Sequence, residues 1–197
     1  MLETLLVTGF GPFGPHATNV SEQAAARLDG LELDGFVIRA LQLPVAFERA
    51  VALLEEALET ERPAAVLATG IHRDPAGFRI ELAARNERDD PLPGVDGVQV
   101  RGGTIEEGGP PMVFSTLPVG AIKRALEEEG LAAELSDDAG RFLCNAIFYW
   151  LARRVPQVGF LHVPPAPDGL EAVARGVRAA ARAVAERLAA QRVEASA

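Results

Sequence analysis

Continuous apolar runs alternate along this chain with segments in which apolar residues recur at helical spacing. The short runs, bounded by glycine or proline, are typical of strands buried on both faces. They predict strands at residues 4–9, 35–43, 64–70, 78–84, 113–117 and 158–163. Apolar positions three and four residues apart predict amphipathic helices at residues 19–30, 46–61, 119–129, 139–154 and 169–195. This alternation predicts an α/β fold, a three-layer α/β/α sandwich around a mostly parallel, twisted central sheet.

One segment departs from the alternation. Residues 86–111 are dense in Gly, Pro and Asp, and the segment is too long for a simple connection, so we expect a functional loop or a small hairpin there. The chain has neither an internal repeat nor a recognisable linker. Its 197 residues therefore predict a single α/β hydrolytic domain over residues 1–197.

Composition and charge narrow the classes of function. Apolar residues make up 48% and charged residues 24% of the chain, as in globular proteins. The net charge of -9 disfavours binding to nucleic acid, because an acidic surface repels phosphates. The N-terminal apolar run is too short for a signal peptide, and no stretch approaches the roughly 20 apolar residues that span a bilayer. A single cysteine excludes an internal disulfide. We therefore expect a cytoplasmic protein that binds no nucleic acid and no membrane.

Candidate chemistry gathers where the strands are predicted to end, the edge at which open α/β sheets bind ligands. Cys144, the only cysteine, lies near the start of the predicted helix 139–154, and His162 lies near the end of the strand 158–163. The first turn of a helix favours a thiolate, and a nearby imidazole stabilises it further. The two residues are a candidate nucleophile and base, although a lone cysteine is more often a small buried apolar residue.

Glu81 lies in the middle of the apolar strand 78–84, where a carboxylate is costly unless it is paired. One interpretation is a solvated edge position or a structural salt bridge with Arg79 or Arg85. The other is an acid that orients His162 and sets its tautomer. The residues alone leave both interpretations open.

The other two histidines, His16 and His72, are both expected to be solvated loop residues. Three dispersed histidines and one cysteine offer no metal-ligand spacing, so we expect no metal site and no cofactor. The glycine turn at residues 9–14 lacks the spacing and the lysine of nucleotide-binding loops. Its phenylalanines, Phe10 and Phe13, instead offer aromatic faces that suit a flat, uncharged ligand.

Taken together, these residues resemble the type I pyroglutamyl peptidases (pyrrolidone-carboxylate peptidases), cytoplasmic cysteine peptidases that remove an N-terminal pyroglutamate from peptides. Four segments match in order: residues 8–14 (TGFGPFG) with Asn19 and Ser21, residues 43–45 (LPV), residues 139–145 (AGRFLCN) and residues 159–164 (GFLHVP). A fifth segment, residues 81–86 (ELAARN) followed by Asp89, matches in part.

The resemblance implies a set of roles. Cys144 would be the nucleophile, His162 the base and Glu81 the orienting acid. Backbone N–H groups near Cys144 and in the Gly70 loop would stabilise the oxyanion. The pyroglutamyl ring would bind against Phe10, Phe13 and Phe142, flanked by Val45 and Leu92. The resemblance also implies the α/β/α fold, a homotetramer and a reaction without a cofactor.

The chain departs from the family pattern at three places. The loop after the strand 64–70 reads GIHRD at residues 70–74 instead of a glycine-rich loop ending in arginine. Leu82 and Pro91 each stand where an arginine is common. These changes leave the candidate triad intact and affect the loops around substrate and oxyanion. The leading hypothesis is an omega peptidase; the alternatives are a non-catalytic homologue that binds pyroglutamyl peptides and a nucleotide-binding α/β domain that uses the glycine turn.

Overall fold

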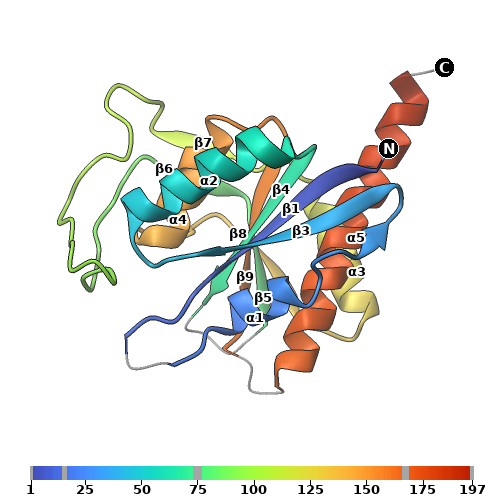
Figure 1. Cartoon of the computed structure of the whole chain (residues 1–197), viewed down its shortest axis with the longest axis horizontal. Coiled ribbons are helices and arrows are strands. Elements are labelled where there is room, and N and C mark those ends of the chain that lie inside the picture. Colours follow the sequence, from blue (N-terminus) through green and yellow to red (C-terminus); the bar gives the residue numbers. More distant parts are fainter. Residues whose placement is uncertain (1, 15–16, 73–76, 166–168, 196–197) are drawn as a thin grey trace.

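The computed structural model describes residues 2–14, 17–72, 77–165 and 169–195 (Figure 1). A twisted, seven-stranded sheet runs through its centre. In spatial order its strands are β2 (Glu32–Leu33), β3 (Phe36–Leu43), β1 (Glu3–Phe10), β4 (Ala65–Ile71), β9 (Val158–Val163), β5 (Phe78–Glu81) and β8 (Ala133–Ser136). The four central strands β3, β1, β4 and β9 are parallel, whereas β2 is antiparallel to β3 and β5 is antiparallel to β9. The sheet is therefore mostly parallel, as predicted.

Helices cover both faces of this sheet (Figure 1). They are α1 (Val20–Ala26), α2 (Phe47–Glu61), α3 (Val119–Glu128), α4 (Leu143–Ala152) and α5 (Leu170–Ala195). Helices α1, α3 and α5 pack together on one face, and α2 and α4 pack together on the other. The prediction of a three-layer α/β/α sandwich is confirmed.

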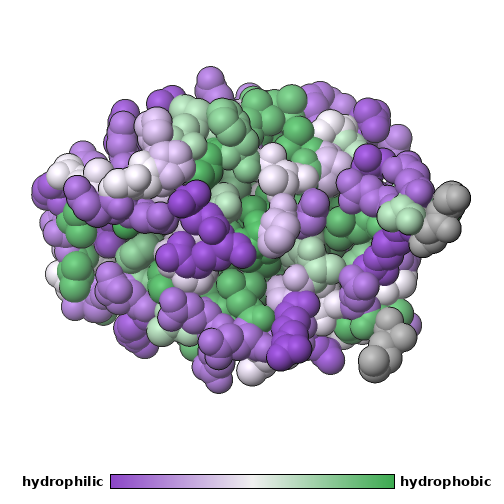
Figure 2. Space-filling model, turned by 90° about the horizontal axis from the view of Figure 1, so that it is seen from above, coloured by the Kyte–Doolittle hydropathy of each residue, from purple (hydrophilic) through white to green (hydrophobic). Residues whose placement is uncertain are grey.

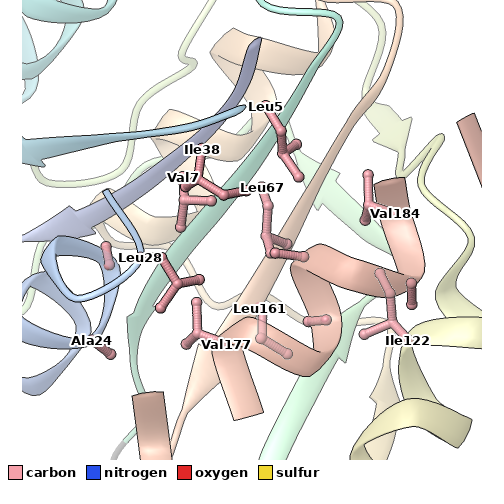
Figure 3. Packing of buried hydrophobic residues seen from close by; sticks show 14 of the residues in the cluster. Leu5, Val7, Ala24, Leu28, Ile38, Leu67, Ile122, Leu161, Val177 and Val184 are labelled. Atoms are coloured by element: carbon pink, nitrogen blue, oxygen red, sulfur yellow. The ribbon is translucent and has the colours of Figure 1, made fainter. Parts of the chain in front are cut away.

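The larger apolar core lies between the sheet and the helices α1, α3 and α5 (Figure 3). Leu5, Leu67 and Leu161 project from neighbouring strands of the sheet, and Leu28 of α1 and Val177 of α5 meet them from the helical layer. Each is essentially removed from solvent. Burying a side chain of this size stabilises the fold by about 1.5–3 kcal/mol relative to leaving it exposed. This packing holds the strands whose carboxyl ends carry the candidate chemistry.

Two predicted strands turn out differently. The segment 78–84 divides at Leu82 into β5, which joins the main sheet, and β6 (Ala83–Arg85), which leaves it. The predicted strand 113–117 is the shorter β7 (Met112–Phe114), and it pairs with β6 as a separate two-stranded antiparallel sheet. The pattern of apolar residues does not reveal this division, because Leu82, Ala83 and Ala84 form an apolar run with no turn residue at the break.

Other differences concern edges and ends. The strands β2 and β8, both at the margins of the sheet, have no counterpart among the predicted strands because they are short and largely exposed. Helix α4 begins at Leu143, later than expected, and α1 ends at Ala26, earlier than expected. Within residues 86–111 the structure has a loop with one isolated β-bridge, between Arg88 and Gly103.

Candidate active site

The site lies at the carboxyl ends of the central strands, where β1, β4 and β9 end side by side (Figure 1). In the register of β4 and β9, Gly70 lies directly opposite His162. Glu81 ends β5, which runs antiparallel to β9 on the side away from β4. The topology thus brings residues from distant parts of the chain to one edge of the sheet.

His162 and Glu81 form a buried pair. The Nδ1 of His162 lies 2.7 Å from Oε1 of Glu81, so the ring N–H donates to the carboxylate. The side chain of Glu81 is fully buried, which excludes the interpretation of a solvated edge position. Arg79, one of the two arginines considered as alternative partners, forms an ion pair with Glu134. With Nδ1 held by the carboxylate, the other ring nitrogen of His162 is available for chemistry.

Cys144 is the second residue of α4, within its first turn, as the sequence predicts. The first N–H groups of a helix have no partner inside the helix, and its dipole favours negative charge there. Gly70 lies against this thiol: a Cβ placed on Gly70 would come within 2.8 Å of Sγ and 3.3 Å of the Phe10 ring. Only glycine therefore fits opposite Cys144 without displacing it.

The electrostatics of His162 follow from these neighbours. Burial disfavours the charged ring, but the charge of Cys144, a hydrogen bond with Cys144 and the hydrogen bond and charge of Glu81 outweigh it. Together they raise the pKa of His162 from 6.5 to about 9. The arrangement therefore favours the charged form of the His162 ring near neutral pH.

Asn145 positions the start of α4, a role that the sequence analysis missed. The amide is fully buried; its oxygen accepts from the Arg85 N–H at 2.8 Å, and its nitrogen donates to the carbonyls of Arg85 and Glu87 at 2.9 Å each. These bonds tie the residue next to Cys144 to β6 and the turn after it. The available signal was a single polar residue in the apolar run 143–151.

The β1–α1 turn is held by two polar residues, Asn19 and Ser21. Asn19 caps α1 by accepting from the Ser21 N–H at 3.0 Å, and its amide donates to the Gly11 carbonyl at 3.1 Å. The Ser21 hydroxyl accepts from the Phe10 N–H at 3.1 Å. These contacts hold the backbone on which Phe10 and Phe13 are carried.

His72 is not the solvated loop residue that the sequence predicts. It is half-buried, its ring meets the His162 ring edge-on with centroids 5.4 Å apart, and Nε2 lies 2.6 Å from the Arg79 guanidinium. The backbone N–H of His72 donates to the Val163 carbonyl, and this hydrogen bond ties His72 to the end of β9. The other loop histidine, His16, and residues 73–76 of the altered loop lie outside the described residues.

A cavity of about 580 Å³ opens in front of Cys144. The rings of Phe13 and Phe142 lie 5.6 Å apart on its wall. The residues predicted to hold a pyroglutamyl ring all line this cavity together with Cys144: Phe10, Phe13, Phe142, Val45 and Leu92. Gly70 does not line it but lies behind the thiol. Pro91, one of the departures from the family pattern, lies on the rim.

Two further features, a membrane-spanning helix and a metal-binding cluster, are absent from the described residues. None of the described helices is long and apolar enough to cross a membrane. Across the same residues, no group of three or more His, Cys, Asp or Glu side chains is arranged to hold a metal ion.

Comparison with known proteins gives one consistent family. The family model for pyroglutamyl peptidase matches residues 3–195. The chain is 36% identical to pyrrolidone-carboxylate peptidase 2 of Photorhabdus laumondii, over 84% of this chain and 79% of that protein. It is 33% identical to the pyrrolidone-carboxylate peptidase of Bacillus licheniformis, over 92% of each.

Solved structures agree with these relatives. Pyroglutamyl peptidase I of Bacillus amyloliquefaciens superposes with a TM-score of 0.90 at 30% identity, over 93% of this chain and 97% of that one. Pyrrolidone carboxyl peptidase of Thermococcus litoralis superposes with a TM-score of 0.89 at 30% identity, over 95% of each chain. The likeness extends over the whole sandwich, including the strands and helix that carry the candidate site.

Proposed function

The chain belongs to the pyroglutamyl peptidase family and is a peptidase of that kind, and we propose that Cys144, His162 and Glu81 carry out its reaction. The reaction is hydrolysis of the bond after an N-terminal L-pyroglutamyl residue. The observation that carries the assignment is the buried His162–Glu81 pair, 2.7 Å apart, beside the thiol in the first turn of α4.

In the first step the Cys144 thiolate attacks the exocyclic carbonyl carbon of the pyroglutamyl residue. The carbonyl electron pair moves to oxygen, and the resulting oxyanion is stabilised by backbone N–H groups at the first turn of α4 and in the Gly70 loop. Removing one such donor typically lowers the rate by about 10²–10³.

In the second step the C–N bond breaks and the imidazolium of His162 gives its proton to the departing amine. A pyroglutamyl thioester then remains on Cys144. The neutral His162, still oriented by Glu81, takes a proton from water, which attacks the thioester carbonyl. Collapse of this second intermediate releases pyroglutamate and returns the thiolate beside a protonated ring.

Preference for the lactam follows from the wall of the cavity. The described lining residues carry no carboxylate, ammonium or guanidinium group, and three of them are phenylalanines. An uncharged ring can pack against Phe13 and Phe142, whereas a free glutamyl or glutaminyl terminus would bring an ammonium ion into the same space. Burying that charge without a partner is strongly unfavourable.

We also propose that the protein works in the cytoplasm as a homotetramer. The single cysteine supports the location, because the fold requires no disulfide and the reaction requires a reduced thiol. Exposed apolar residues support an oligomer: Phe114 is 64% and Val98 51% exposed, and Figure 2 shows apolar surface within the polar surroundings of one face. Light scattering after size-exclusion chromatography measures the subunit number directly; a monomer at micromolar concentration would contradict the tetramer.

One assay tests the proposed activity. The protein is mixed with a pyroglutamyl fluorogenic amide, with and without prior treatment by iodoacetamide, and the matching glutaminyl amide is the control substrate. We expect turnover of the pyroglutamyl amide alone, abolished by alkylation. Binding without turnover would favour the non-catalytic homologue, and protection of the thiol by ATP would favour a nucleotide-binding domain.

A further inference from the structure

An arginine, Arg79, lies beside the buried His162–Glu81 pair. It is directly opposite His162 in the antiparallel pairing of β5 with β9, so the two side chains share a face of the sheet. Glu81 follows two positions further along β5, and alternate residues of a strand also share a face. The guanidinium therefore belongs to the same face as both members of the pair.

Glu81 has one carboxylate oxygen in reserve. Its Oε1 binds Nδ1 of His162, whereas Oε2 is buried and has no hydrogen-bond partner among the described residues. A guanidinium is permanently charged, and its planar fork of N–H groups matches a carboxylate. Pairing of Arg79 with Glu81 is thus the competing arrangement, and it would cancel the charge that Glu81 gives to His162.

Two other side chains hold Arg79. Its Nε forms the ion pair with Glu134, which lies directly opposite it on the edge strand β8. Its Nη1 lies 2.6 Å from Nε2 of His72. Because a guanidinium only donates, Nε2 of His72 accepts, and a ring that accepts there is neutral. Both contacts engage guanidinium nitrogens with partners other than Glu81.

The charges around His162 are balanced by this arrangement. Cys144 of α4 and Glu81 of β5 favour the charged ring. The cation of Arg79 would oppose it, but the carboxylate of Glu134 offsets that cation. The His72 ring, which meets the His162 ring edge-on, adds no charge of its own in the neutral form.

We propose that His72 and Glu134 are positioning residues that hold the Arg79 guanidinium away from Glu81, so that the carboxylate serves His162 alone. The inference rests on the proposed function and adds two residues to it, neither of which touches the reacting atoms. It gives a role to His72, which lies in the loop where the chain departs from the family pattern.

His72→Phe tests the arrangement, because it keeps a ring against His162 and removes only the acceptor for Arg79. With Nη1 released, the guanidinium should turn to Glu81. We expect kcat to fall by about tenfold and the high-pH limb of kcat/KM to move down by about one pH unit or more. KM should change little, since His72 is not among the described residues that line the cavity.

The double variant His72→Phe/Arg79→Gln also removes the competing cation. It should recover kcat to within about threefold of the wild type and return the limb to near pH 9. Arg79→Gln alone should stay within the same range. If His72 had only a structural role, the second substitution would add damage instead of repairing it. A folded double variant that does not recover, or a His72→Phe variant with wild-type kcat and limb, would overturn the inference.

NMR titration with ¹³C-labelled histidine gives a readout that does not depend on turnover, because the chain has only three histidines. The pKa of His162 should be lower in His72→Phe than in the wild type and should be restored in the double variant. A wild type that cleaves no pyroglutamyl amide would contradict the proposed function, and the titration would still decide this inference. Cleavage by the wild type with no restoration of the His162 pKa in the double variant would contradict the inference alone.

Glu134→Gln tests the other contact and should move the pKa of His162 in the same direction as His72→Phe. Glu129→Gln is the matched control, since Glu129 also pairs with an arginine, Arg175, but in the layer of α3 and α5. The control should leave both the pKa and kcat unchanged. Equal effects of Glu134→Gln and Glu129→Gln would exclude Glu134 from the role.

Discussion

A carboxylate in the middle of a sheet is tolerated only when its charge is held, and Glu81 is held by the ring of His162. At the scale of single residues this pair decides the chemistry that we propose. The carboxylate sets which nitrogen of His162 faces Cys144, and it stabilises the ring when that ring is charged. The roles themselves stay predictions, and two measurements address them.

Glu81→Gln should lower kcat by roughly several hundred-fold, yet less than removal of the Cys144 thiol, because an amide can orient an imidazole but cannot stabilise an imidazolium. The amide can still accept the ring N–H, so the melting temperature should change little. Both quantities are to be measured on one preparation. A kcat within about threefold of wild type would leave Glu81 with a structural role only.

The pH dependence of activity follows from the raised pKa of His162. In the folded protein the ring keeps its proton up to about pH 9, whereas an unperturbed histidine loses it near 6.5. The corresponding stabilisation of the fold is complete below pH 6.5 and is lost as the pH rises through about 9. Because the leaving amine needs this proton, kcat/KM should fall at high pH with an apparent pKa near 9.

The profile also distinguishes the contribution of Glu81. In Glu81→Gln the high-pH limb should move to lower pH, because one of the groups that raises the pKa of His162 has lost its charge. Rates measured from pH 6 to pH 10 in buffers of constant ionic strength give the high-pH limb of the wild type and of Glu81→Gln. A wild-type limb centred near pH 7, or a limb that Glu81→Gln leaves in place, would be incompatible with this electrostatic account.

At the scale of elements, the start of α4 is what presents the thiol. Phe142, the N-cap, has no side-chain atom that could cap the helix, so the opening N–H groups of α4 remain available for substrate. The helix end is fixed from the side instead, by the buried Asn145 amide and its bonds to the backbone of Arg85 and Glu87. The two-stranded β6–β7 sheet thereby supports the nucleophile.

Asn145→Ala should therefore cost about 2–3 kcal/mol of unfolding free energy, because three partly buried backbone groups lose their partner. It should also lower kcat, since the residue after Cys144 is released from β6. Urea unfolding and steady-state kinetics measure the two effects. Asn145→Asp is the matched comparison: it keeps the acceptor for Arg85 but repels two carbonyls, so it should be no more stable than Asn145→Ala. A loss below about 0.5 kcal/mol in Asn145→Ala would contradict the anchoring role.

Some elements of the fold could be predicted from the sequence, and others could not. The strands β1, β4 and β9 are largely buried on both faces and appear as mostly apolar runs, and α2 was placed within one residue. The edge strand β8 could not be found because it is short and its Leu135 is largely exposed. The antiparallel direction of β5 leaves no local mark in the sequence, yet it is what brings Glu81 to His162. The residues alone left the pairing of Glu81 with His162 as one of two interpretations, and the resemblance to the family favoured it.

At the scale of the whole molecule, the site depends on both layers of helices at once. The layer of α2 and α4 supplies the thiol, and the layer of α1 and α5 supplies Val20 and Leu170 to the wall of the cavity. The fold of the chain, its family and its candidate site thus agree with one reaction at the sheet edge. In the described part of the altered segment, His72 lies against the His162 ring, and the departures from the family pattern do not remove any of the three proposed catalytic groups.

The central claim, that Cys144 is the nucleophile of a pyroglutamyl peptidase, is tested most directly by Cys144→Ser assayed with a pyroglutamyl fluorogenic amide. The change is small and lies in a helix turn that accepts serine, so the variant should fold and melt like the wild type. We predict that its turnover falls below about a thousandth of the wild-type rate, as expected when an activated nucleophile is lost. Retention of a tenth or more of wild-type activity by the purified, folded variant would contradict the account.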